Sequence, residues 1–221
     1  AVNSDRFPVL IKFIDAKQNL SVQVHPDDNY SKKIEGEPGK TEMWYVADAK
    51  EGSGLLCGFK KDLTKEAFMA SIKDNTITDY LNFIPVKKGD VLFISPGTVH
   101  AICENCVIAE IQQNSDITYR VYDFGRVDSN GNSRELHIDK AADVSNLKGE
   151  IFSVKPMGTP KQMDGYISTM LVQCDYFNVN ELKVSDHALL SADAESFNAL
   201  TFIDGQGDII CNNTKEPFKK G

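Results

Sequence analysis

The chain of 221 residues lacks long hydrophobic runs and clusters of basic residues. No segment approaches the roughly 18 consecutive apolar residues that a membrane-spanning helix requires. Residues 1–13 also lack the basic start and long apolar middle of a secretory signal. The 24 basic and 32 acidic residues give a net charge of −8, and no stretch of Lys and Arg offsets it, which disfavours a nucleic-acid partner. These absences predict a cytoplasmic protein that binds neither membranes nor nucleic acid.

Cysteine is sparse and odd in number. Because the chain has five cysteines, they cannot all pair with one another, which fits a reducing compartment. Cys103 and Cys106 have the spacing of a redox or zinc pair, but no second Cys/His pair with matching spacing accompanies them. We therefore predict a tight connection between strands at this point.

Short strand-like segments make up most of the first two thirds of the chain. They are runs of apolar and β-branched residues bounded by turn residues, a pattern typical of an all-β barrel or sandwich. The runs are 9–14, 20–24, 42–46, 54–59, 86–94 with an interruption at Gly89-Asp90, 99–102, 106–112 and 118–122. The polar segment between the first two predicts a hairpin. Residues 63–84 have helical spacing instead and predict two short helices.

Four polar residues stand where strands can direct them toward one point. Gln23 and His25 are two residues apart in a strand, so their side chains share a face. His100 begins the strand that follows a Pro-Gly turn, and Glu42 opens another strand, where a carboxylate is either solvated or bound to a cation. Two imidazoles with one carboxylate leave coordination positions open for water or substrate, as in catalytic metal sites. The pattern predicts a metal site.

The two remaining histidines have no comparable partners. His137 lies in the sequence Arg-Glu-Leu-His-Ile, and His187 follows Ser-Asp in a polar segment. We predict that both are surface residues.

Four ordered motifs carry a resemblance to a known family. They are LSVQVHPDD (20–28), GKTEMW (39–44), GTVHAI (97–102) and QNSDITYR (113–120). Together they resemble the type I phosphomannose isomerase family in its short bacterial form. The resemblance is strong over residues 7–147 and weaker up to 221. It implies a mainly β fold, in which a cupin-type β-barrel (jelly roll) with a small helical insertion is followed by a second, incomplete cupin-like barrel.

The predicted domain boundary follows residue 147. Residues 1–147 are expected to form the metal-binding catalytic barrel, with its helical segment at about 63–84. Residues 148–221 are expected to form the second β domain, with strands at 170–174, 177–182, 197–203 and 205–211. The closing sequence PFKKG echoes PVKKG at 85–89, so the second barrel would still need its last strands, and an open barrel exposes strand edges. We therefore expect a fragment at the C-terminus and, since a core strand begins near residue 7, at the N-terminus too.

The resemblance also implies the residues of an active site. Gln23, His25, Glu42 and His100 would hold one zinc ion per chain, with Gln23 as the ligand that the family adds to the three found above. Arg120 is the implied catalytic residue, and Lys40 and Lys12 would lie near the substrate. For a phosphate group, the candidates in order are Lys12, Arg126 and Ser21.

The implied reaction interconverts mannose 6-phosphate and fructose 6-phosphate through an enediol intermediate. Charge develops on oxygen in such an aldose-ketose isomerisation, and zinc and Arg120 would stabilise it. The base that moves the proton could be Lys40 or a group near Glu42, and the sequence does not separate these two candidates.

Two other functions compete with the isomerase. An iron cupin oxygenase commonly presents a histidine-rich ligand set, so Gln23 disfavours it. A non-catalytic sugar-binding or regulatory double cupin is disfavoured because Arg120 and all four ligands are present. The expected partner is a small-molecule sugar phosphate, and the sequence gives no sign of an obligate protein partner.

Overall fold

The computed structural model describes residues 6–212 and 214–220, most of whose regular structure is β. The strands are β1 (Val9–Ala16), β2 (Val22–Val24), β3 (Glu42–Ala49), β4 (Gly54–Phe59), β5 (Leu81–Pro85), β6 (Val91–Ile94), β7 (His100–Ile102), β8 (Cys106–Gln113), β9 (Tyr119–Tyr122), β10 (Lys161–Gln162), β11 (Tyr166–Gln173), β12 (Asn178–Val184), β13 (Gln206–Cys211) and β14 (Thr214–Lys219). The helices are α1 (Asp28–Ile34), α2 (Lys65–Lys73), α3 (Ile77–Tyr80) and α4 (Ile138–Val144). None of these helices has the length and apolar character needed to cross a membrane. The chain divides into two compact units, Arg6–His187 and the residues from Ala188 onward.

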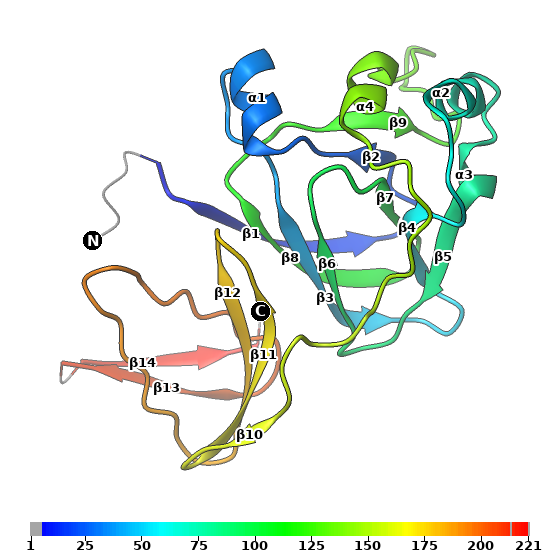
Figure 1. Cartoon of the computed structure of the whole chain (residues 1–221). Coiled ribbons are helices and arrows are strands. Elements are labelled where there is room, and N and C mark those ends of the chain that lie inside the picture. The colour runs from blue at the N-terminus through cyan, green and yellow to red at the C-terminus, as the bar shows by residue number, and fades with distance from the viewer. Residues whose placement is uncertain (1–5, 213, 221) are drawn as a thin grey trace. The chain divides into compact units, whose positions relative to one another are not determined.

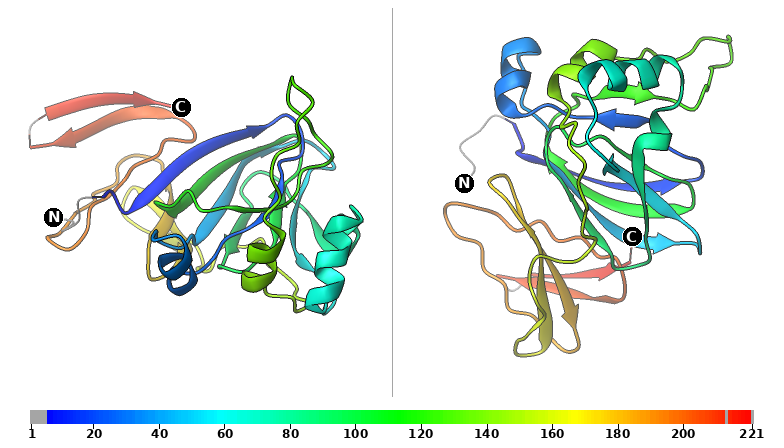
Figure 2. Two further views of the ribbon diagram at one scale, coloured as in Figure 1. Left: turned by 90° about the horizontal axis from the view of Figure 1, so that it is seen from above. Right: turned by 45° about the vertical axis from the view of Figure 1, so that its right-hand side comes forward.

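Two antiparallel sheets form the first part of the larger unit. One has the order β1-β8-β3-β6 and the other β5-β4-β7-β2-β9, and the pairing among described residues leaves them as separate sheets. A core cluster takes buried apolar side chains from both sheets, including Trp44 and Ile108 from the first and Leu55 and Ile102 from the second. A second cluster joins the other face of the five-stranded sheet to α2, α3 and α4, which lie along that sheet in both views (Figures 1 and 2).

The short strand β2 shows how alternation builds the site. Val22 and Val24 are fully buried in the cluster beneath the helices. Gln23 therefore faces the opposite side, toward the space between the sheets, because successive residues of a strand alternate. It lies directly across from His100 on β7 and Arg120 on β9. One row across three strands thus carries three of the predicted site residues.

The predicted hairpin between the first two strands is wrong. β1 pairs along its whole length with β8, and β2 pairs with β7 and β9 in the other sheet. The polar segment between them carries the chain from one sheet to the other. Pairings between strands about a hundred residues apart decided the outcome, and the local turn pattern holds no information about them.

The helical segment predicted at 63–84 extends past the end of α3 at Tyr80. Thr64 caps α2 by accepting a hydrogen bond from the Ala67 amide at 3.2 Å, and α3 follows. From Leu81 the chain is the edge strand β5, which pairs with β4. Leu81 is buried there, and pairing with a strand outweighed the local helical spacing.

Two predicted strands are shorter than expected or missing. The run 86–94 has its predicted interruption, because residues 87–90 form a turn in which Asp90 accepts a hydrogen bond from the Lys87 amide, and β6 begins only at Val91. The run 197–203 forms no strand. Its residues are mostly exposed, so little apolar burial favours an extended pairing there.

The second half of the chain forms smaller sheets. β10, β11 and β12 make a three-stranded sheet within the larger unit, and β13 and β14 make a hairpin in the other. The domain boundary at residue 147 stays a prediction.

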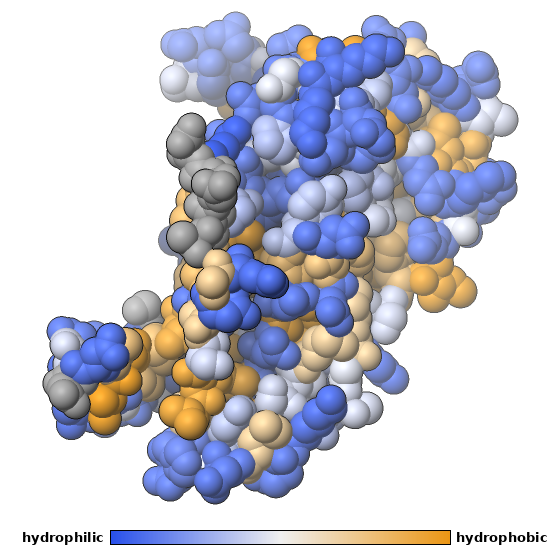
Figure 3. Space-filling view, turned by 60° about the vertical axis from the view of Figure 1, so that its left-hand side comes forward, coloured by the Kyte–Doolittle hydropathy of each residue, from blue (hydrophilic) through white to orange (hydrophobic). Residues whose placement is uncertain are grey.

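Some large apolar side chains are exposed, such as Phe13 and Ile210, and hydrophobic patches interrupt the mostly hydrophilic surface (Figure 3). The Cys103–Cys106 segment is the tight β7–β8 connection that was predicted, with Asn105 at φ +65°.

Candidate metal centre

Three ligand-type side chains meet between the two sheets. Glu42 opens β3 in the first sheet, His100 opens β7 in the second, and His25 directly follows β2. One nitrogen or oxygen of each lies within 4.8 Å of the others. All three are buried, with at most 1% of their surface exposed. The structure therefore brings together His25, Glu42 and His100, as the sequence predicted.

Three of the facing atoms of this triad lack a hydrogen-bond partner among the described residues. His25 Nε2 lies 3.5 Å from Glu42 Oε2, and His100 Nε2 lies 3.2 Å from Glu42 Oε1. Among the described residues, His25 Nε2 and both Glu42 oxygens are buried without a hydrogen-bond partner. A buried polar atom left unpaired costs about 1–3 kcal/mol, and more when it is charged. A cation between these atoms would satisfy them together.

The far side of each ring fixes which nitrogen carries the proton. His25 Nδ1 lies 2.9 Å from the carbonyl oxygen of Ile117, and His100 Nδ1 lies 2.8 Å from that of Thr98. A carbonyl oxygen can only accept, so in each neutral ring Nδ1 donates and Nε2 presents a lone pair. Two lone pairs and a carboxylate then converge on one point. Backbone carbonyls orient metal-binding histidines in this way.

The charge states also suit a cation. Burial lowers the pKa of His25 well below its usual value, against the opposing influence of Glu42, so the ring is neutral near neutral pH. Burial alone would raise the pKa of Glu42, but positive charge on His25 when it is protonated, and on Lys40, holds it below its usual value. A neutral imidazole and an ionised carboxylate are the forms that bind metal ions.

Gln23 and Lys40 border the triad. The Gln23 amide nitrogen is 3.3 Å from His100 Nε2, and rotation of the carboxamide exchanges this nitrogen for the oxygen. Lys40 is buried, and its Nζ lies 3.2 Å from Glu42 Oε2. The geometry therefore fits Gln23 as a fourth ligand and places the Lys40 ammonium beside the centre.

Arg120 occupies the same row as Gln23 and His100. Its Nη1 donates to the carbonyl oxygen of Glu135 at 3.0 Å, whereas its buried Nε has no hydrogen-bond partner within the described part of the chain. Burial, together with the nearby Arg134, lowers the pKa of Arg120 from its ordinary value, which leaves it charged at neutral pH. A charged N–H group thus remains for another acceptor.

The three phosphate candidates have different surroundings. Lys12 Nζ donates to Glu110 at 3.0 Å and to Gln112 at 2.6 Å, and Gln112 is the direct cross-strand neighbour of Glu42. Ser21 is buried immediately before β2. Arg126 is bound instead to the Asp123 side chain and, at 2.7 Å, to the carbonyl oxygen of Asn19. The phosphate roles of Lys12, Ser21 and Arg126 stay predictions.

Sequence reasoning missed the residues that support the centre from the first sheet. Glu110 is buried on β8, where it accepts from Lys12 and, at 2.9 Å, from the indole nitrogen of Trp44. The Trp44 ring in turn packs nearly perpendicular to the His100 ring, with ring centroids 5.3 Å apart. Glu110 and Gln112 alternate with apolar residues in β8, and this alternation was an available signal.

Gly39 holds the loop before Glu42 against α1. A Cβ at this position would lie 2.4 Å from the backbone carbon of Asp27 and 2.5 Å from the backbone nitrogen of Asp28. Since these are backbone atoms, the loop must move to accept a side chain. We expect Gly39→Ala to destabilise the protein by about 1–3 kcal/mol and to weaken metal binding, as measured by thermal unfolding and metal titration. The exposed Lys33→Ala on α1 serves as control, and an unchanged Gly39→Ala would contradict the tight fit.

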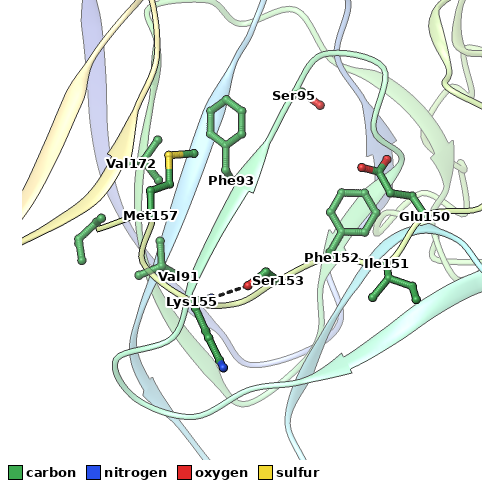
Figure 4. Close-up of a pocket in the computed structure, with 11 residues that line it drawn as sticks. Val91, Phe93, Ser95, Glu150, Ile151, Phe152, Ser153, Lys155, Met157 and Val172 are labelled. Carbon is green, nitrogen blue, oxygen red and sulfur yellow. Dashed lines mark hydrogen bonds between the residues drawn. The ribbon is translucent and has the colours of Figure 1, made fainter. Parts of the chain in front are cut away.

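A separate cavity of about 250 Å³ lies against the outer face of the first sheet. Figure 4 shows its mostly apolar lining, in which Phe93 of β6 faces Met157 and Val172. Among the lining residues only Glu150 and Lys155 are charged, and no member of the triad takes part. This cavity lacks the converging donors and acceptors of the candidate centre.

The two facing sheets and the buried His-Glu-His triad define a cupin-type protein with a candidate metal site. Residues 1–61 match the family model "Phosphomannose isomerase type I, catalytic domain", and residues 167–221 match "Mannose-6-phosphate isomerase, cupin domain". Mannose-6-phosphate isomerase ManA of Bacillus subtilis is 39% identical over 223 residues, covering 100% of this chain and 69% of the relative. The chain belongs to the type I mannose-6-phosphate isomerase family, and it is an isomerase.

Further relatives agree with this assignment. Mannose-6-phosphate isomerase of Streptococcus mutans is 38% identical over 218 residues, covering 99% of this chain and 67% of the relative. The crystal structure of the Bacillus subtilis mannose 6-phosphate isomerase superposes with a TM-score of 0.90 at 37% identity, covering 100% of this chain and 69% of that one. The predicted family and cupin-type β fold are confirmed.

Proposed function

We propose that the protein is a zinc-dependent enzyme that interconverts mannose 6-phosphate and fructose 6-phosphate through an enediol intermediate. The observation that carries this proposal is the buried convergence of two imidazoles and a carboxylate on one point, where His25 Nε2 and both Glu42 oxygens have no hydrogen-bond partner among the described residues. His25, Glu42 and His100 would hold the zinc ion, with Gln23 as the fourth ligand. Three strong nitrogen and oxygen donors, here those of His25, Glu42 and His100, are the number of protein ligands typical of catalytic zinc.

The bound zinc ion would supply a Lewis acid that stabilises negative charge developing on the sugar oxygens. Arg120 would add a second, fixed positive charge, and its unpartnered Nε–H is a donor for one of those oxygens. The preorganised position of Arg120 costs no reorganisation during the reaction. Lys12 and Ser21 are proposed to bind the phosphate group, with Arg126 as the weaker candidate because Asp123 already engages it.

The proton between the two reacting carbons needs a group that can both accept and donate. Lys40 is buried beside Glu42 and can reach the centre, so its neutral amine, formed when the ammonium loses a proton, is our candidate to accept the proton from one carbon and return it to the other. Glu42 itself is committed to the metal in this proposal. A small-molecule sugar phosphate is therefore the expected partner, and no step calls for a second protein.

Removal of metal should abolish turnover. We expect the full-length protein dialysed against a chelator to lose conversion of mannose 6-phosphate, because both the zinc ion and the order it gives to Gln23 and Glu42 are gone. Adding back one equivalent of zinc should restore the activity. The measurement is the rate of fructose 6-phosphate formation, alongside elemental analysis of the protein.

The controls separate the competing functions. Magnesium added to the apoprotein should not restore the rate, because this ion prefers an octahedral shell of oxygen ligands. Full turnover in the metal-free protein would refute the zinc dependence. Bound iron with oxygen consumption would favour a cupin oxygenase, and tight binding of the sugar phosphate without turnover would favour a regulatory cupin.

A further inference from the structure

The backbone of Arg120 is held on its outer side by a histidine ring. β9 is an edge strand of the five-stranded sheet, so on its outer side the Arg120 amide has no neighbouring strand. His137 Nδ1 accepts a hydrogen bond from this amide at 3.0 Å, and the His137 amide donates to the Arg120 carbonyl oxygen at 2.8 Å. One residue therefore satisfies both backbone groups of Arg120.

The same segment also holds the Arg120 side chain. The carbonyl oxygen of Glu135, two residues before His137, accepts from Arg120 Nη1 at 3.0 Å. Arg134 anchors the start of the segment through Asp123, three residues after Arg120, with Nε donating to Asp123 Oδ2 at 2.7 Å. Residues 134–137 thus form a strap along β9, fixed to the Arg120 side chain through Glu135 and to the Arg120 backbone through His137.

The ring of His137 is not used for its local helix. His137 stands at the N-cap of α4, where Ser, Thr, Asp or Asn normally accepts a hydrogen bond from the first turn. In this chain its side chain makes no such bond and turns to Arg120 instead. The imidazole accepts there, so it acts with Nδ1 unprotonated.

We propose that His137 is a positioning residue for the guanidinium of Arg120. By fixing the Arg120 backbone and the strap that binds Nη1, it sets where the unpartnered Nε–H points. This inference rests on the proposed function, in which Arg120 acts on the reacting oxygens. His137, which was predicted to be a surface residue, is half-buried against β9.

The test compares two substitutions at the same position. His137→Leu removes the acceptor, and we expect kcat to fall by about 10- to 100-fold, as for a displaced catalytic group. KM and zinc content should be unchanged. His137→Asn places an amide oxygen near the position of Nδ1 and should restore most of kcat. The control is His187→Leu, which replaces an exposed histidine.

A double-mutant cycle tests whether the effect passes through Arg120. In the Arg120→Ala background, His137→Leu should have no further effect on kcat. The inference would be overturned if His137→Leu lowered kcat equally in both backgrounds. It would also be overturned if the leucine and asparagine variants lost the same kcat, or if the leucine variant kept the wild-type kcat. Absence of turnover in the wild-type protein would overturn the proposed function itself, together with this inference.

Discussion

His100→Ala is expected to lose both bound zinc and turnover. The His100 ring is fully buried, and it presents one of the two converging nitrogen lone pairs. Without it the carboxylate of Glu42 faces His25 and Lys40 alone, and the centre keeps too few donors to hold zinc tightly. A metal Lewis acid is worth several kcal/mol to the transition state, so kcat should fall by about 10³-fold or more. Elemental analysis and steady-state kinetics measure the two losses.

Glu42→Gln tests the same centre with less disturbance of packing. The amide keeps the shape of the side chain but removes the negative charge that faces both rings, so zinc affinity should fall while the fold is retained. For His100→Ala the matched control is His187→Ala, because that histidine is exposed and pairs with Asp186 at the surface. A His100→Ala protein with a full equivalent of zinc and wild-type turnover would show that the reaction does not depend on this triad.

Local patterns in the sequence were sufficient to predict that His25, Glu42 and His100 come together. Alternation in residues 22–25 put Gln23 on the face opposite Val22 and Val24, and the structure has this arrangement. The Pro-Gly turn before His100 brought β7 alongside β2. These features depend on two-residue periodicity and turn chemistry, which are readable over a few positions.

Pairings between distant segments could not be read in this way. The sequence pattern gave β1 the wrong partner, because nothing in residues 9–24 encodes the eight-residue match of β1 with β8. The helical spacing that continued past Leu81 was overruled by pairing with β4. Strand partners depend on which surfaces are buried together, and this is a property of the whole fold.

The supporting residues of the site depend on the same long-range order. Glu110 contacts Lys12 because β8 lies beside β1, and its contact with Trp44 arises because β3 lies on the other side of β8. His137 reaches Arg120 only after a turn of the chain that returns residues 134–138 to the edge of β9. A single histidine without partners in the sequence therefore gave no sign of this contact.

Arg120→Ala is expected to lose turnover while keeping its zinc. Arg120 lies on β9 directly beside Gln23 of β2, but it offers no metal-binding atom, so the zinc content should stay at one per chain. Removing one preorganised donor to a developing oxyanion typically costs about 10²–10³ in kcat. Arg120→Lys should recover part of this loss, since it restores the charge without the planar set of N–H donors. Separate measurement of kcat, KM and zinc content distinguishes this result from that of His100→Ala.

Arg6→Ala is the matched control for this substitution, because Arg6 makes a surface ion pair with Glu37. It should leave kcat and KM unchanged. The distribution of the effect between the two constants identifies what Arg120 does. A fall in kcat with little change in KM indicates an interaction made in the transition state. A rise in KM with kcat unchanged would contradict the proposed role, because Arg120 would then hold the sugar phosphate equally in the ground state and the transition state.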